Sequence, residues 1–216
     1  MTHSLHRRGS RESLSRDFVV LSCSAKGFNN HNYAEFCRKF MQICLKHNPV
    51  NFGDMKTGNW LYIDPQEIIE RISNNTIVEI TYDSKENVIS LMKELKEADL
   101  GISVVISGIS EIVDEIAREA GLGQVHTREY SLGTHGKTER LPEWEILEFH
   151  TMCGHAMVSP ELIKKMIMDV KLGRKTPHEA TVVMGKCCSC GNFNIPRSIE
   201  LLEANLPLWT IDDPVY

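Results

Sequence analysis

The chain has 216 residues, of which 42% are hydrophobic and 25% charged, which is ordinary for a globular protein able to bury its own core. Its formal net charge of -5 argues against general nucleic-acid binding, and no apolar run approaches the roughly 18 to 20 residues of a membrane span. Seven cysteines, an odd number, fit a reducing cytoplasm better than a disulfide framework, so we expect a cytoplasmic protein without nucleic-acid or membrane partners.

The first sixteen residues are rich in arginine and serine, and Glu12 is their single acidic residue. We treat residues 1–16 as a basic N-terminal arm. A solvated tail is one interpretation, because chain ends are often poorly ordered. The alternative is an arm that folds over a neighbouring subunit of a homo-oligomer, or that brings His3, His6 and Arg7 to an anionic ligand.

Strand and helix patterns alternate over residues 17–136. Short apolar runs predict strands, and apolar residues spaced three and four apart predict helices. The predicted strands are 17–23, 76–83, 101–108 and 125–132, and the predicted helices are 32–47, 85–98, 110–120 and a segment beginning at Asp64-Pro65. Alternation with short connections is typical of βαβ units. We therefore expect an α/β domain over 17–136 with a partly parallel sheet.

The pattern changes after Gly136. Proline stands at the start of each of four further predicted helices, and Ser159 and Thr176 are positioned as N-caps. The predicted helices are 142–150, 160–172, 177–184 and 196–204. We expect residues 137–216 to form a helical C-terminal region.

Four of the seven cysteines lie in this helical region. Lys186-Cys187-Cys188-Ser189-Cys190-Gly191 places three thiols within four positions, and Met152-Cys153-Gly154-His155 supplies a fourth. Both CxxC and CxC pairs can bind one metal centre, because a short loop brings the two sulfurs to the same side. The sequence therefore predicts a metal or iron–sulfur site whose candidate ligands are Cys153, Cys187, Cys188, Cys190 and His155.

Three clustered thiols and Cys153 do not fit one tetrahedral ion together, so we expect one of Cys187 and Cys188 to be idle, and we favour Cys188 as the ligand. In the interpretation that we favour, Cys153, Cys188 and Cys190 hold a [4Fe–4S] cluster. In the other, a CxxCG knuckle ending at Cys190 is completed by Cys153 and His155 around zinc. Buried core thiols without any metal are the third possibility.

The iron–sulfur interpretation predicts an enzyme. A cluster with one open iron acts as a Lewis acid on a small anionic substrate, in lyase, hydratase or sulfur-transfer chemistry. His155 and His135 are the candidate acid–base catalysts, since His135 lies in a glycine-flanked loop that allows close approach to a ligand. Cys23 is a further candidate nucleophile or ligand, and residues 108–110 are a candidate phosphate site. The zinc interpretation predicts an accessory or regulatory protein instead.

Overall fold

The computed structural model describes residues 7–209, and residues 1–6 and 210–216 lie outside the described part. The protein is a mixed α/β structure, as the sequence predicts. Its strands are β1 (Phe18–Cys23), β2 (Asn51–Asp54), β3 (Gly58–Asn59), β4 (Ile77–Tyr82) and β5 (Val105–Ser107). They form one sheet in the order β3-β2-β4-β1-β5.

The predicted partly parallel sheet is wrong, because all neighbouring strands of the described sheet are antiparallel. The strand order explains the error. β1 and β2 run in the same direction, but β4 is inserted between them, and β1 in turn separates β4 from β5. The strand–helix–strand crossovers thus join parallel strands that are not neighbours, which is the split βαβ arrangement. Adjacent and split βαβ units have the same alternating sequence pattern.

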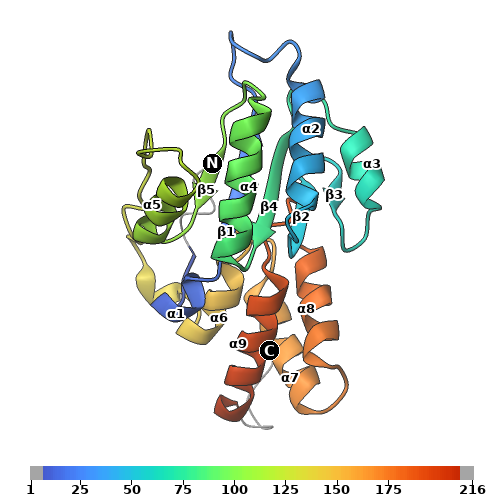
Figure 1. The fold of residues 1–216 in the computed structure, drawn as a ribbon. Helices are drawn as coiled ribbons and strands as arrows, with labels where there is room; N and C mark the ends of the chain where they lie inside the picture. Colours follow the sequence, from blue (N-terminus) through green and yellow to red (C-terminus); the bar gives the residue numbers. More distant parts are fainter. Residues whose placement is uncertain (1–6, 210–216) are drawn as a thin grey trace.

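Helices cover one face of this sheet. The helices of the N-terminal part are α1 (Arg11–Leu14), α2 (Tyr33–Leu45), α3 (Pro65–Glu70), α4 (Lys85–Ala98) and α5 (Ser110–Glu119). Figure 1 shows α2 and α4 side by side against the sheet. Val78, Ile80 and Tyr82 of β4 point toward them and share a buried core with Cys37 and Cys44 of α2. Cys37 and Cys44 are therefore core thiols, fully buried between helix and sheet.

Two segments of the α/β part differ from their predictions. The turn-rich stretch before Asp64 contains the short strands β2 and β3, which the sequence pattern did not indicate. The predicted strand 125–132 is not a strand, and the residues between 121 and 143 form a mostly exposed connection apart from one short 3-10 turn, η2 (Thr138–Arg140). Alternating side chains stabilise a strand only when one face is buried, and almost all of these side chains are exposed.

The C-terminal part is helical, as predicted. It contains α6 (Trp144–His150), α7 (Pro160–Lys171), α8 (Pro177–Lys186), α9 (Ile195–Asn205) and the 3-10 turn η3 (Leu206–Leu208). Ser159 caps α7, and Thr176 forms a capping box with Glu179 at the start of α8, so both predicted caps are confirmed. Figure 1 shows α6 to α9 gathered below the sheet. They enclose a second hydrophobic core, distinct from the first.

The predicted boundary between the α/β domain and the helical region, at residues 136 and 137, stays a prediction.

None of the helices within 7–209 has the length and apolar character needed to cross a membrane.

Candidate metal centre

The turn between α6 and α7 meets the loop between α8 and α9, and this brings four of the predicted ligands together. The Sγ atoms of Cys188 and Cys190 are 3.8 Å apart, and Cys190 Sγ is 3.6 Å from Nδ1 of His155. Cys153 contacts Cys188 through a hydrogen bond between the two thiols. The three thiols are at most 1% exposed, and His155 is half-buried. The four donors therefore form a chain of contacts from Cys153 to His155.

The other predicted site residues do not enter this chain. The thiol of Cys187 turns back along α8 and lies 3.7 Å from the carbonyl oxygen of Val183. His135 lies on the exposed connection before α6, with its Nε2 atom 2.9 Å from the carbonyl oxygen of Leu132. Cys23 ends β1 and interacts with Tyr33 of α2.

Backbone N–H groups point at the sulfur of Cys153. The amides of His155 and Met157 donate to this thiol, and the turn is closed by a 2.9 Å hydrogen bond from Ala156 N to the Cys153 carbonyl. Ala156 has a φ of 55°, a left-handed conformation that costs a non-glycine residue about 1–2 kcal/mol. The strained residue thus lies in the turn that wraps the sulfur, and strain of this kind clusters at functional sites.

The loop between α8 and α9, residues 187–193, is held by side chains from distant parts of the chain. They bind its carbonyl groups and those of the preceding helix end. Asn59 Nδ2 donates to the carbonyls of Gly185 (2.9 Å) and Cys188 (2.7 Å), Thr81 Oγ1 to Gly191 (2.8 Å), Arg7 Nη2 to Asn192 (2.5 Å) and Asn51 Nδ2 to Phe193 (2.9 Å). The N–H of Asn192 in turn donates to the sulfurs of Cys188 and Cys190. Hydrogen bonds of this kind orient and tune metal-binding thiolates.

The loop lies on the face of the sheet opposite α2 and α4. Gly53 of β2 and Glu79 of β4 are paired across the two strands and share this face, which the loop covers. The carboxylate of Glu79 is buried and contacts the thiol of Cys190. Sequence reasoning missed Glu79, because an acidic residue in an alternating strand normally faces solvent. Its position inside an otherwise apolar run was the available signal.

The contacts among the three thiols, together with their burial, raise the pKa of each of them. The hydrogen bond with Cys188 and burial both raise the pKa of Cys153. The contact with Cys153 lowers the pKa of Cys188, but the contact with Cys190 and burial outweigh it and raise the pKa overall. For Cys190, the contact with Cys188 lowers the pKa. Burial and the nearby carboxylate of Glu79 outweigh this effect, so the pKa is raised overall. Because metals bind thiolates, an ion entering here would have to displace these protons.

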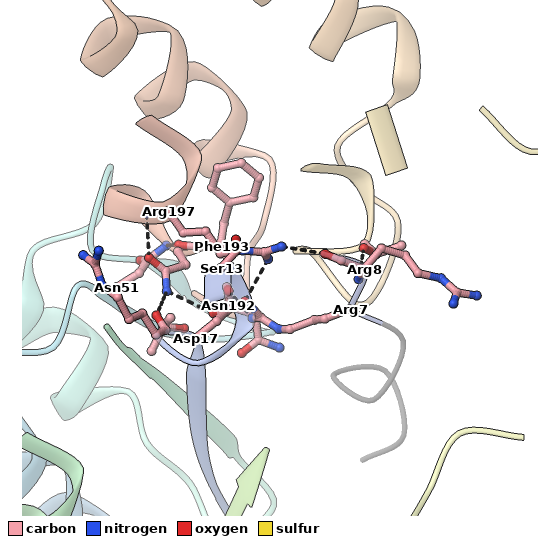
Figure 2. Close-up of polar contacts among 12 residues, drawn as sticks. Arg7, Arg8, Ser13, Asp17, Asn51, Asn192, Phe193 and Arg197 are labelled. Atoms are coloured by element: carbon pink, nitrogen blue, oxygen red, sulfur yellow. Dashed lines mark hydrogen bonds and ion pairs between the residues drawn. The ribbon is translucent and has the colours of Figure 1, made fainter. Parts of the chain in front are cut away.

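The N-terminal arm is fastened beside the thiols by a buried ion-pair network. Asp17 has a fully buried side chain, and its Oδ2 atom pairs with both Arg7 and Arg197, the latter at 2.9 Å. Arg197 also donates from Nε to the hydroxyl of Ser13 at 2.8 Å and from Nη2 to the carbonyl of Arg8. Figure 2 shows this network between the arm and α9. Residues 7–16 of the arm thus fold onto their own chain, while His3 and His6 lie outside the described residues.

The predicted phosphate site has mixed charge. Residues 108–110 line a hollow of about 220 Å³ together with Arg7, but Asp17 and Glu129 line it as well. The two carboxylates oppose the attraction of an anion to the start of α5, so this hollow adds no support to a phosphate site.

Within residues 7–209, no group of three or more His, Cys, Asp or Glu side chains is placed so that it could hold a metal ion. Cys153, Cys188, Cys190 and His155 contact one another one after the other, as a chain, and they do not surround a common point. No protein-family model, no curated protein and no solved structure matches this chain.

Proposed function

We propose that this protein binds a single metal ion of the zinc type through Cys153, Cys188 and Cys190, with His155 as the fourth donor. The contact chain that joins these four side chains is the observation that carries the proposal. Because no three of these donors surround one point, the proposal includes a shift of the thiols as well as a rotation of the half-buried His155 side chain toward the ion.

The distances between donors support a single ion. Tetrahedral zinc with Zn–S bonds near 2.3 Å and Zn–N bonds near 2.05 Å places two sulfurs about 3.8 Å apart and a sulfur and a nitrogen about 3.6 Å apart. The contact of Cys190 with Cys188 has this sulfur–sulfur separation, 3.8 Å, whereas His155 reaches the ion only after its rotation. A hydrogen bond between two thiols gives a similar separation, so measuring the metal content is the deciding experiment.

A [4Fe–4S] cluster held by Cys153, Cys188 and Cys190 is the second candidate. The backbone N–H groups that face the sulfurs favour it, because such hydrogen bonds also tune iron–sulfur clusters. Each cysteine of such a cluster binds a different iron, so Cys188 and Cys190 would have to move apart from their present contact. The lyase, hydratase or sulfur-transfer activity on a small anionic substrate is a prediction tied to this candidate.

The nearly complete burial of the three thiols supports a structural role for the ion. Structural zinc sites are closed, whereas catalytic sites keep an open position. A zinc-stabilised accessory or regulatory protein therefore follows from the first candidate. The cytoplasmic location is part of the same proposal, since a reducing compartment keeps thiols available as ligands.

Metal analysis of anaerobically purified protein tests the proposal. We expect about one equivalent of zinc per chain and no matching iron and sulfide, because four donors complete one tetrahedral ion. Colour, with iron and sulfide in near-equal amounts, would support the cluster instead. Absence of bound metal in the purified protein, and no thermal stabilisation when zinc or iron with sulfide is added to it, would contradict both.

Cys188→Ser and Cys187→Ser form a matched pair, because each replaces the sulfur atom of one of two adjacent cysteines by oxygen. We expect Cys188→Ser to lose the metal and Cys187→Ser to retain it, since the Cys187 thiol faces the Val183 carbonyl. The zinc-dependent rise in melting temperature checks the same point, because only a ligand that binds the folded state shifts it. Loss of metal from Cys187→Ser with retention in Cys188→Ser would show that the ligand assignment is wrong.

A further inference from the structure

One residue, Asn192, connects the N-terminal arm to the thiols through its two backbone groups. The N–H of Asn192 donates to the sulfurs of Cys188 and Cys190, and the carbonyl of the same residue accepts a hydrogen bond from Arg7 Nη2. Arg7 thus binds the carbonyl of the residue whose N–H faces the thiols. Figure 2 shows Arg7 reaching from the arm toward Asn192 beside Asp17.

Arg7 is itself held firmly. Its side chain is only 7% exposed and is paired with the buried carboxylate of Asp17. That carboxylate is fixed a second time by Arg197, and Asn194 Nδ2 donates to its other oxygen at 3.0 Å. A buried guanidinium that is both ion-paired and hydrogen-bonded has little freedom, so it fixes the orientation of the carbonyl that it binds.

We infer that Arg7 is a positioning residue of the proposed metal site and that the docked arm controls exchange of the ion. The inference rests on the proposed function. Arg7 fixes the carbonyl of Asn192. Because this carbonyl and the N–H of Asn192 flank the same Cα, the contact restricts the backbone angles that direct the N–H toward the sulfurs. Such outer partners typically change metal affinity by about 10–100-fold when they are removed.

Access to the thiols depends on the loop that buries them. Cys188 and Cys190 are at most 1% exposed, so a chelator or an incoming ion reaches them only when the loop opens. Release of Arg7 from Asn192 frees the loop on the arm side. Undocking of residues 7–16 is then the motion that admits or releases the ion.

The experiment compares Arg7→Gln with the wild-type protein loaded with zinc. We expect zinc to pass to a chromophoric chelator about 10–100-fold faster from Arg7→Gln, as for other outer-partner substitutions. In metal-free protein, we expect a small aromatic disulfide reagent to modify Cys188 and Cys190 severalfold faster in this variant. This second measurement tests control by the arm even if wild-type protein binds no metal, so failure of the inference and failure of the proposed function are distinguishable.

Two control variants separate positioning from general loosening of the arm. Arg16→Gln removes the same charge, but the Arg16 side chain is 55% exposed and pairs with exposed Glu200. Ser13→Ala removes the hydroxyl that accepts from Arg197 Nε and leaves the hydrogen bond to Asn192 in place. We expect both to release zinc and to react with the reagent within about twofold of the wild-type rates. Exposed pairs such as that of Arg16 contribute little, and Ser13→Ala keeps both ion pairs of Asp17 and the contact of Arg7 with Asn192. Equal acceleration in Ser13→Ala and Arg7→Gln, or wild-type rates in Arg7→Gln, would overturn the inference.

Discussion

Asp17→Asn is expected to lower the free energy of unfolding by about 3–5 kcal/mol, the typical loss when one partner of a buried ion pair is removed. The carboxylate of Asp17 is fully buried and faces two guanidinium groups, those of Arg7 and Arg197. Asparagine has a similar shape but no charge, so both cations lose their ion pair with residue 17, and Glu148 is a remaining nearby carboxylate for Arg197. Burial already lowers the pKa of Arg197, an effect that nearby Asp17 opposes. Urea denaturation followed by circular dichroism measures the change.

Glu200→Gln is the matched control for this prediction. It removes one carboxylate charge from an ion pair with Arg16 in which both side chains are more than half exposed. We expect a change below about 1 kcal/mol, as is usual for surface pairs. An equally small loss in Asp17→Asn would mean that the buried network does not hold the arm in solution. That result would also remove the basis for control of the thiols by Arg7.

Gly191→Ala is expected to destabilise the protein by about 3 kcal/mol or more and to abolish metal binding. A Cβ atom at this position would lie 2.2 Å from the carbonyl carbon of Phe52 and 2.5 Å from the amide nitrogen of Gly53. These are backbone atoms of β2 and cannot rotate away, so the loop would have to lift from the sheet. Overpacking of this kind costs about 1–3 kcal/mol, and the left-handed φ of 81° adds a further 1–2 kcal/mol.

Gly173→Ala separates these two contributions. Gly173 also has a left-handed φ, 68°, but an added Cβ there meets no atom within 4 Å. Only the conformational cost of about 1–2 kcal/mol applies, and metal content should be unchanged. Chemical denaturation and metal analysis of both variants provide the comparison. Equal destabilisation by the two substitutions would contradict the close packing of the loop against β2.

The local features of the fold could be predicted because their causes lie within a few residues. Ser159 and Thr176 cap their own helices, and apolar spacing alone placed the helix at 85–98 with the bounds that α4 has. Strand direction could not be predicted in this way. Whether a crossover passes over an intervening strand depends on which distant strand pairs with which, and the local pattern is the same in both cases.

The candidate site was predictable only in its donors. The thiol spacing identified Cys153, Cys188 and Cys190, and the structure brings these three together with His155. The residues that bind the loop carbonyls, such as Asn51 and Thr81, carry no local sign of that role. Their hydrogen bonds to the loop span 142 and 110 residues, so only the folded chain shows them.

The fastening of the loop by side chains from the arm and the sheet has a consequence for how the newly made chain acquires its thiol site. The arm and the sheet leave the ribosome first, but Arg197 meets Arg8 across 189 positions and Phe193 meets Asn51 across 142. Synthesis proceeds at about 5–20 residues per second, so the early partners wait for many seconds. A chain that stops before α9 carries every cysteine without the enclosure that buries them. Protection of the thiols therefore arrives only after α9 has been synthesised.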